Sequence, residues 1–373
     1  MTAIKILSCF SGIGGLEGTV APIAVCEIDP LARGVLKTRF PEAEQFEDIT
    51  TILPPRADIL LGGWPCQDIS IAGDQAGLQG ERSRLFYDLL RVGKTSKAHT
   101  IVAENVPNLL KMRQGKEFYE VLEEFAAHGY AYISWRTLNA RQFSLPQERR
   151  RVFIVASTHR EVAHSIHRDV ELNLHSGSLG TDPAFGFYWT AGIQGLSYHR
   201  GVCPTIKVGS SLDIASPPAV HVGGMVRKLK PSECLRLQGF AAEGFEGLSD
   251  SNIYRMAGNA VARPVGNFVV DGASQVLNNS SVPTQSGFFG SSGVPTGGWS
   301  GEGRWEGGEV TAVHRPRPMA LIANLSAFLE NSFDGYELSA RAAAGLISRM
   351  DSSGKQWPTG LRDALNTRMA SAK

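Results

Sequence analysis

The sequence predicts an α/β fold built around a largely parallel sheet. Short apolar runs of strand length alternate with segments of helical spacing, glycine-rich or acidic turns follow the runs directly, and the alternation lapses only after residue 157. The expected strands are residues 5–10, 23–26, 59–61, 100–103, 132–138 and 151–157. Because ligands bind such sheets beyond the carboxyl ends of the strands, the functional site is expected at that edge.

The first expected strand runs into a glycine-rich turn at residues 11–15, and a helix begins near Leu16. Glycine lets the backbone approach a ligand without a Cβ in the way, and a helix N-terminus adds N–H donors. Many nucleotide-binding folds share such a turn, so it is weak by itself. Its F-x-G-x-G-G spacing differs from the dinucleotide fingerprint G-x-G-x-x-G, which disfavours an oxidoreductase.

Acidic residues follow the next segments. Glu27 stands at the end of the second expected strand, where a carboxylate is suited to accept hydrogen bonds from both hydroxyls of a ribose. Asp29 precedes Pro30 and is more plausible as a helix cap. Asp48 is a softer candidate for a ligand contact, because an acidic residue beside an apolar one is common anywhere.

Cys66 is the candidate nucleophile. It follows the third expected strand through two glycines and Pro65, which present it beyond the strand's carboxyl end. A lone cysteine in an intracellular chain is more often a small buried hydrophobic residue, so its neighbours must decide. The glycine-rich residues 71–80 suit a lid over substrate, although a surface loop has the same composition.

Charged side chains stand at two later positions. Glu104 follows the fourth expected strand and faces the same edge as Cys66. Gln147, Arg149 and Arg151 alternate along an extended segment and would share one side of it, because strand side chains alternate between faces. This arrangement suits contacts with a phosphate and with the carbonyl of a base.

Composition limits the class of protein. The 37 Lys and Arg residues balance 36 Asp and Glu residues, so any nucleic-acid affinity must come from local basic clusters at 149–151 and 227–230, each of which alone is more often a solvated face. Five cysteines without a C-x-x-C pair argue against a disulfide framework and a zinc site, so free thiols are expected. Neither a membrane span nor a secretion leader is recognisable, which predicts a cytoplasmic protein.

Residues 158–221 lack the regular alternation. Histidines at 159, 164, 167 and 175 invite a metal-site hypothesis, but their spacing matches no ligand motif, so solvated histidines are expected. Aromatic and polar residues at 185–190 and 198–200 lie among turns, and core packing explains most of the aromatic ones equally well.

Six short motifs occur in an order that resembles the cytosine-C5 DNA methyltransferase family. They are FSGIGG at 10–15, PCQ at 65–67, AENV at 103–106, QERRR at 147–151, RLQGF at 236–240 and GNAV at 258–261. The resemblance spans about residues 4–275. It implies a Rossmann-like sheet that binds S-adenosylmethionine, a smaller irregular target-recognition domain, double-stranded DNA as partner, and a role in restriction-modification or phage DNA protection in a bacterial cell or phage-infected host.

The resemblance also implies a role for each site residue. Cys66 would be the nucleophile, Glu104 would contact N3 of the target cytosine, and Arg151 would reach its O2. Arg149 would support the catalytic loop or contact a phosphate. The implied cofactor-binding residues are Phe10, Gly12, Ile13, Gly14, Glu27, Ile28, Asp48, Ile49, Pro65, Asn259 and Val261. The implied DNA-binding residues are Gln67, Ser70, Arg82, Gln147 and Arg200, with Thr181, Gln194 and His199 as further possible base readers, and no metal is implied.

Under this resemblance the chemistry is nucleophilic catalysis. C5 of cytosine is too electron-poor for direct methylation, so the Cys66 thiolate adds to C6, while Glu104 is protonated or shares the proton with N3. The cytosine must be flipped out, because C6 is inaccessible within a stacked duplex. One alternative is an RNA cytosine-C5 methyltransferase, although its characteristic C-F-T segment is absent. The other is a non-catalytic DNA-binding regulator, against which the intact Cys66, Glu104 and Arg151 speak.

Five consecutive segments are expected. Residues 1–157 form the catalytic cofactor-binding domain, 158–250 the target-recognition domain, and 251–277 return to the catalytic domain. Residues 278–308 are rich in glycine and serine, which is linker composition, and 309–373 form a helical C-terminal appendage. A small helical bundle, a dimer contact and an added DNA contact are all open for the appendage, and the protein is otherwise expected to be a monomer.

Overall fold

The computed structural model describes most of the chain. The described residues are 3–65, 84–170, 184–189, 198–207, 216–278, 288–291, 301–306, 309–313, 324–331, 335–353 and 357–371. They belong to two units, each assembled from three separate stretches of the chain. Unit 1 comprises Met1–Asn139, Arg150–Glu171 and Val261–Met319, and unit 2 comprises Ala140–Arg149, Leu172–Ala260 and Ala320–Lys373. The chain therefore alternates between the units instead of forming the five consecutive segments predicted.

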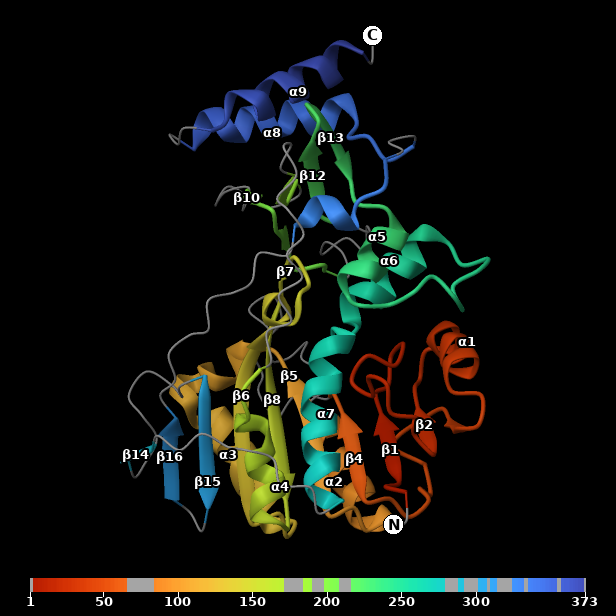
Figure 1. Ribbon diagram of the computed structural model, residues 1–373, viewed down its shortest axis with the longest axis vertical. Helices are drawn as coiled ribbons and strands as arrows, with labels where there is room; N and C mark the ends of the chain where they lie inside the picture. Colours follow the sequence, from red (N-terminus) through yellow and green to blue (C-terminus); the bar gives the residue numbers. More distant parts are fainter. Residues whose placement is uncertain are drawn as a thin grey trace. The chain divides into compact units, whose positions relative to one another are not determined.

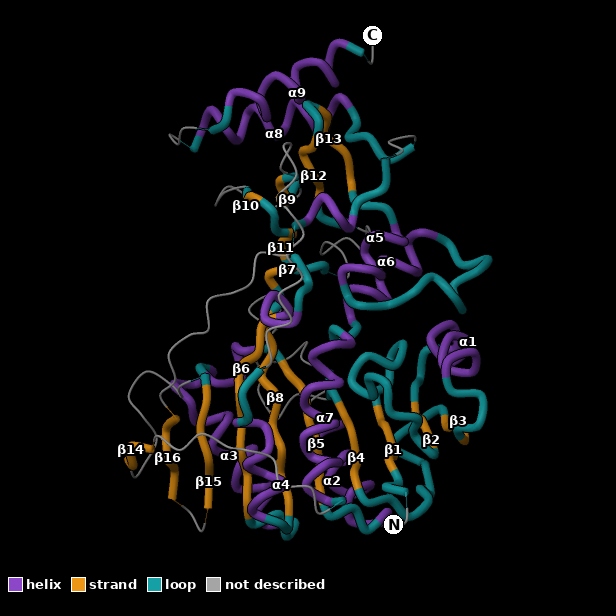
Figure 2. Tube along the Cα trace, in the orientation of Figure 1, coloured by secondary structure: helices purple, strands orange, loops and turns teal. Residues whose placement is uncertain are grey.

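Unit 1 is built on one mixed sheet, in the order β14-β16-β15-β6-β8-β5-β4-β1-β2-β3 (Figures 1 and 2). Neighbouring strands from β3 to β5 run parallel, and β8 runs antiparallel to both β5 and β6. The α/β prediction is confirmed. The strands are β1 Ile6–Cys9, β2 Ala24–Cys26, β3 Glu44–Phe46, β4 Ile59–Gly62, β5 Thr100–Asn105, β6 Tyr132–Asn139 and β8 Arg150–Ser157.

Helices cover both faces of this sheet, with α4 and α7 on one face and α2 and α3 on the other (Figure 1). The first helix, α1, begins at Pro30 because the Asp29 carboxylate accepts a hydrogen bond from the Leu31 amide at 3.0 Å, as the sequence predicted. The helices of unit 1 are α1 Pro30–Arg39, α2 Arg84–Ser96, α3 Lys116–Ala127, α4 Arg160–His164 and α7 Arg263–Leu277.

An aromatic core fills the layer between the sheet and helices α2 and α3. Phe86 packs against Trp64 at a ring separation of 5.0 Å and against Phe125 at 5.3 Å. Phe118 meets Trp135 of β6 edge-on at 5.1 Å. Aromatic side chains of this kind each bury about 150–250 Å². This layer therefore fixes the strands whose carboxyl ends carry the site.

Three C-terminal strands extend the sheet of unit 1 beyond β6, which corrects the prediction of a linker at 278–308. They are β14 Phe288–Ser291, β15 Glu302–Glu306 and β16 Glu309–Val313. β15 pairs antiparallel with β6 along its whole length. Gly303 lies directly over the Trp135 indole, where an added Cβ would come within 2.2 Å of the ring. The glycine that indicated a linker instead permits this close approach.

Two of the histidines considered for a metal site form polar contacts that connect β15 with α4 and with the turn that follows α4. His164 Nε2 lies 2.8 Å from Glu306 Oε1, and His167 Nδ1 lies 2.7 Å from Glu302 Oε1. Burial lowers the pKa of His164 to about 4. His167 is fully buried. The prediction of solvated histidines is therefore wrong at these two positions.

Unit 2 contains a four-stranded antiparallel sheet in the order β10-β9-β12-β13 and a separate short parallel pair, β7 with β11 (Figure 2). Its strands are β7 Gln147–Glu148, β9 Phe185–Phe187, β10 His199–Arg200, β11 Cys203–Pro204, β12 Ala219–Val222 and β13 Met225–Lys228. Its helices are α5 Pro231–Leu237, α6 Asp250–Asn259, α8 Ala340–Ser352 and α9 Thr359–Ala370, and 3-10 turns lie at Ala140–Phe143 and Leu325–Phe328.

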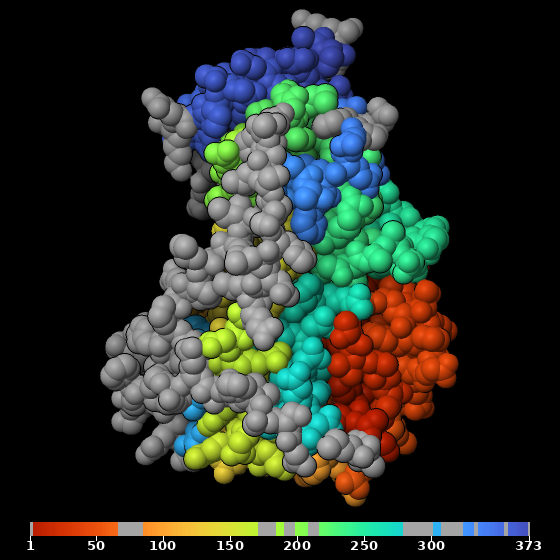
Figure 3. All heavy atoms as spheres, in the orientation of Figure 1, coloured from red at the N-terminus to blue at the C-terminus, as the bar shows by residue number. Residues whose placement is uncertain are grey.

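Helices α8 and α9 pack against the four-stranded sheet and share its core. Their residues lie directly against those of β12 and β13 in the space-filling view (Figure 3). Leu346 and Leu365 are fully buried in one cluster with Phe187, Ala219 and Val226 of the sheet. The predicted helical appendage is therefore divided: β16 belongs to unit 1, whereas residues from Ala320 on belong to unit 2 and include α8 and α9.

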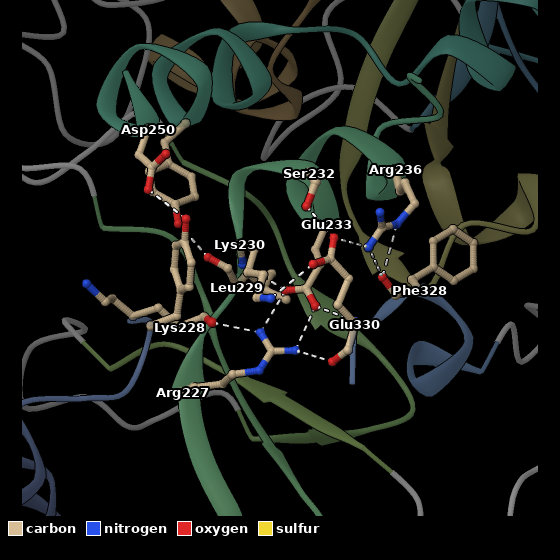
Figure 4. A network of polar contacts seen from close by, with 12 residues as sticks. Arg227, Lys228, Leu229, Lys230, Ser232, Glu233, Arg236, Asp250, Phe328 and Glu330 are labelled. Carbon is tan, nitrogen blue, oxygen red and sulfur yellow. Dashed lines mark hydrogen bonds and ion pairs between the residues drawn. The ribbon is translucent and has the colours of Figure 1, made fainter. Parts of the chain in front are cut away.

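A polar network binds residues 324–331 to α5 and to the strand before it (Figure 4). Arg227 and Glu233 form a fully buried ion pair at 2.6 Å. Glu330 accepts hydrogen bonds from Ser232 at 2.5 Å and Lys230 at 3.0 Å, and its backbone N–H donates to Glu233 at 2.7 Å. Both terminal nitrogens of Arg227 and both carboxylate oxygens of Glu233 thus meet partners in this network. No helix in the described part of the chain has the length and apolar character of a membrane span.

Candidate active site

The carboxyl ends of four neighbouring strands place several of the predicted site residues at one edge of the sheet of unit 1. Cys9 of β1 is in register with Cys26 of β2 and with Gly62 of β4, and Gly62 is in register with Ala103 of β5. The residues that come next along each strand are Phe10, Glu27, Gly63 and Glu104. Aligned strand ends thus gather residues that lie far apart in the sequence.

The glycine-rich turn after β1 has the left-handed backbone that its composition predicts. Gly12 and Gly14 have φ of +55° and +81°, and an added Cβ at Gly12 would meet no atom within 4 Å. Phe10 also has a positive φ of 54°, which is costly for a residue with a side chain. Ile13 between them is buried. The turn therefore leaves open space at Gly12 while Phe10 is held in a strained conformation.

The start of α7 packs closely behind this turn. A Cβ at Gly15 would lie 2.1 Å from the Val261 carbonyl oxygen, and one at Gly266 would lie 2.2 Å from the Gly15 carbonyl oxygen. These approaches require glycine, so the turn and the segment at Val261 hold each other in place. Asn259, the last residue of α6, belongs to unit 2.

Glu27 is held in a fixed orientation at the end of β2. The Gly12 amide donates a hydrogen bond to its Oε2 at 2.7 Å, and the Asp29 amide donates to its Oε1 at 2.9 Å. Each carboxylate oxygen retains a lone pair for a further donor. Beside it, Ile28 is 68% exposed although it is a large apolar residue. A fixed acceptor next to an uncovered apolar side chain fits the ribose and adenine of a nucleoside cofactor.

Asp48 and Ile49 differ in how well they suit the predicted adenine contacts. Asp48 is half-buried, and its Oδ1 accepts a hydrogen bond from the Thr50 amide at 2.9 Å, so it also stabilises its own turn. Ile49 is buried in the aromatic core of unit 1. Ile49 is therefore a core residue of unit 1. Its packing on an adenine ring remains a prediction.

Glu104 and Arg151 form an ion pair at the ends of β5 and β8. Arg151 Nε lies 3.1 Å from Glu104 Oε1, and the two side chains are 13% and 19% exposed, Glu104 being the less exposed. Gly63 lies beside them, because an added Cβ there would be 3.1 Å from Glu104 Oε2. The pair predicted to hold the base is thus preassembled, and a glycine leaves room against the carboxylate.

Cys66 itself lies outside the described residues, as do Gln67, Ser70 and Arg82. Pro65, the last described residue before it, is half-buried. The preceding Trp64 is buried against Phe86, and its carbonyl accepts a hydrogen bond from Asn105 at 3.4 Å. The strand end that leads to Cys66 is therefore anchored next to Glu104.

Gln147 and Arg149 have structural roles in unit 2 that the alternation argument did not predict. Gln147 is fully buried and donates a hydrogen bond to the Leu237 carbonyl at 2.8 Å, so the prediction that it binds DNA is wrong. Arg149 is 3% exposed, and its guanidinium donates to the carbonyls of Gly258 at 3.0 Å and Ala260 at 2.7 Å. A phosphate contact does not fit a guanidinium buried in this way.

The side chains at 147, 149 and 151 do not share one side of a strand, because the chain leaves β7 at Glu148 and enters β8 only at Arg150. Support of the catalytic loop by Arg149 remains a prediction, since residues 66–83 are not among those described.

The possible base readers are only partly visible. His199 and Arg200 form β10 and are both exposed, as a base reader would have to be. Thr181 and Gln194 lie outside the described residues.

Sequence reasoning missed Glu17, which is fully buried beneath the glycine-rich turn. Ser8 donates a hydrogen bond to Glu17 Oε1 at 2.6 Å, and Ser11 donates to the Ser8 hydroxyl at 3.0 Å. Burial raises the pKa of the Glu17 carboxyl. The available signal was an acidic residue directly after the Gly-Gly-Leu of the turn.

The other cysteines are poor candidates for a nucleophile. Cys9, Cys26, Cys203 and Cys234 are free and buried, and burial raises the pKa of Cys203 and Cys234 well above the ordinary value. A thiol of that kind is inert. Among the described residues, no group of three or more His, Cys, Asp or Glu side chains could hold a metal ion.

Known proteins share both the sequence and the fold. The family model of the C-5 cytosine-specific DNA methylases matches residues 4–180. The type II methyltransferase M2.BsuMI of Bacillus subtilis (strain 168) is 34% identical over 296 residues, which cover 73% of this chain and 76% of that protein. The type II methyltransferase M.NgoBI of Neisseria gonorrhoeae is 30% identical over 288 residues, or 70% of this chain and 90% of that protein.

The fold matches solved methyltransferases at low sequence identity. The Dnmt2 methyltransferase of S. pombe has a TM-score of 0.51 at 16% identity, with 74% of this chain and 99% of that chain covered. The methyltransferase EhMeth of Entamoeba histolytica has a TM-score of 0.50 at 16% identity and the same coverage. These structures share the fold, and the family model and the bacterial relatives show that the chain belongs to the family of C-5 cytosine-specific DNA methylases.

Proposed function

We propose that this DNA cytosine-C5 methyltransferase uses Cys66 as its nucleophile and holds the target cytosine with Glu104 and Arg151. The observation that supports this most is the ion pair between Glu104 and Arg151, next to the strand end that leads through Gly63 and Pro65 to Cys66. The inertness of the buried cysteines leaves Cys66 as the thiol to test.

The first step forms a bond between the Cys66 sulfur and C6. The thiolate supplies the electron pair, the C5–C6 double bond opens, and the electrons move toward N3, where the proton on Glu104 is shared. C5 thereby becomes nucleophilic. Arg151 would donate to O2, which also draws electrons away from the ring. After methyl transfer, C5 gives up its proton to a base, and the C5–C6 double bond re-forms as the thiolate leaves.

Phe10, Gly12, Glu27 and Ile28 would hold the methyl donor, S-adenosylmethionine. When bound, this cofactor supplies an electrophilic methyl group on a sulfonium. Glu27 would accept from the ribose hydroxyls, and its orientation is already fixed by two backbone amides. Phe10 and the exposed Ile28 would exclude water from the adenine.

The substrate is double-stranded DNA, and the target base would be flipped from the helix at a cost of a few kcal/mol. Arg200, together with Gln67, Ser70 and Arg82 near the nucleophile, would contact the DNA. Relatives named type II methyltransferases support a role in protecting one DNA sequence from a restriction enzyme.

A covalent trap tests the nucleophile. DNA that carries 5-fluorocytosine at the target site should form a stable adduct with the wild type and S-adenosylmethionine. A base can remove a hydrogen from C5 as a proton, but it cannot remove the fluorine that replaces it, so the thiolate is not released. Cys66→Ser should form no adduct and methylate nothing while still binding DNA. Cys234→Ser, which alters a buried inert thiol, is the matched control and should be trapped normally.

The same preparation should be assayed on duplex DNA and on tRNA. Methylation of tRNA alone would support the RNA-modifying alternative. Binding to DNA without any methylation by the wild type would support the regulator. Methylated plasmid that resists cleavage by a restriction enzyme at the methylated sequence would support the protective role.

A further inference from the structure

The C-terminal helices share one core with the strands that carry the possible base readers. Leu346 of α8 and Leu361 of α9 are fully buried against Phe187 of β9 and Ala219 of β12. Trp189 and Tyr198 pack against the same cluster. The apolar face of these helices is therefore covered within the chain itself, which leaves no need for a dimer partner at that face.

A single arginine of α8 reaches the segment that follows β9. Arg349 Nη2 donates a hydrogen bond to the Trp189 carbonyl at 2.5 Å. The Trp189 indole in turn donates to the Pro217 carbonyl at 2.7 Å. Hydrogen bonds from a charged donor are stronger than neutral ones. Arg349 thus fixes the backbone where the chain leaves β9.

An aromatic stack fixes the backbone where the chain returns to β10. Tyr198 lies against Phe185 at a ring separation of 4.8 Å, and its hydroxyl lies 2.7 Å from His221 Nδ1. On the other side, His221 lies next to Gly360 of α9, where an added Cβ would be 3.5 Å from its ring. α9 therefore supports the stack that precedes His199 and Arg200.

We propose that Arg349 is a positioning residue for DNA recognition, and that α8 and α9 form the support on which strand β10 presents His199 and Arg200 to DNA. The proposal rests on the proposed function, in which Arg200 contacts the duplex. β10 consists of only two residues and pairs with β9 through Phe185 and Gly186. Such a short strand cannot orient its side chains by itself, so the packing behind it decides where they point.

The test replaces Arg349 in the full-length protein. Arg349→Met keeps the apolar stem but removes the donors, and Arg349→Lys keeps one cationic donor. Arg368→Met is the matched control, because Arg368 also donates to a backbone carbonyl, that of Leu338 at 2.6 Å, within the C-terminal segment. The readouts are the KM for duplex DNA, the KM and affinity for S-adenosylmethionine, kcat, and the base preference mapped by bisulfite sequencing of a methylated plasmid library.

Arg349→Met should raise the KM for duplex DNA roughly tenfold, equivalent to about 1.4 kcal/mol, and relax the base preference. Its affinity for S-adenosylmethionine should stay within about twofold of the wild type, because Phe10, Glu27 and Ile28, which would hold the cofactor, belong to unit 1. Arg349→Lys should recover part of the loss. Arg368→Met should reduce thermal stability but leave the base preference unchanged.

Two results would overturn the proposal. One is a folded Arg349→Met enzyme with wild-type KM for DNA and wild-type base preference. The other is an equal effect of Arg349→Met and Arg368→Met on every readout, which would indicate stability alone. A wild-type protein that methylates no DNA would instead contradict the proposed function, so the two failures are distinguishable.

Discussion

Glu104 and Arg151 hold each other in place before any base arrives, with 3.1 Å between Oε1 and Nε. The proposed acid role of Glu104 requires that a proton be shared with N3 once the cytosine is present. In the proposed mechanism the arginine would orient the carboxylate, and the carboxylate would orient the arginine toward O2 of the base.

Glu104→Gln should slow the single-turnover methylation rate by roughly 10²–10⁴, because the amide keeps the shape but cannot supply the proton. DNA and cofactor binding should persist. Adding Arg151→Met to this variant should reduce the methylation rate by a much smaller factor than Arg151→Met does in the wild type, since the two residues would act as a unit. Rapid-quench measurement of the wild type, the two single variants and the double variant checks this. A double variant whose rate loss equals the product of the two single losses would argue against the pair.

Glu17 makes the stability of unit 1 depend on pH. Burial raises its pKa above the ordinary value of 4.5. The stabilisation from the protonated Glu17 is complete below about pH 4.5 and is lost as pH rises through the raised pKa. The free energy of unfolding of the wild type, measured with urea, should therefore fall relative to that of Glu17→Gln as pH rises above 4.5. Glu42→Gln, at an exposed position, is the control. A pH-independent difference would contradict this assignment.

At the scale of elements, the sequence predicted the strands of unit 1 well but not its C-terminal ones. β4 and β5 contain the short apolar runs at 59–61 and 101–103, which are typical of buried strands. β15 alternates Gly303 and Trp305 with charged residues, and its glycine exists because Trp135 lies beneath it. A contact that depends on a residue more than 160 positions away leaves no local pattern, so the composition indicated a linker.

The site was predictable to the same extent. Glu27 and Glu104 follow predicted strand ends, and the motif AENV also identifies Glu104. Gln147 and Arg149 were misplaced because alternation assumes one continuous strand, whereas β7 ends at Glu148. A buried glutamine and a buried arginine that bond to carbonyls look the same in sequence as residues that face a substrate. Only tertiary structure separates these cases.

Across the whole molecule, the chain passes repeatedly between two units, and residues 320–373 return to unit 2 last. The buried faces of α8 and α9 and the polar contacts of Glu330 hold this last segment in unit 2. The Ser232 hydroxyl, together with Lys230 and Arg236, lowers the pKa of Glu330 to about 2. The stabilisation from Glu330 is therefore complete above the ordinary value of 4.5 and is lost as pH falls through about 2.

A protease site inserted between Val313 and Asn324 tests how firmly this last segment is held. After cleavage at pH 7 the C-terminal fragment should stay with the remainder on size-exclusion chromatography, because its apolar face completes the core of unit 2. Acidification from pH 4.5 toward 2 should release it. Glu330→Gln should already bind its fragment more weakly at pH 7, and the difference from the wild type should shrink in acid. A fragment that elutes separately at pH 7 would mean that the helices are an appendage after all.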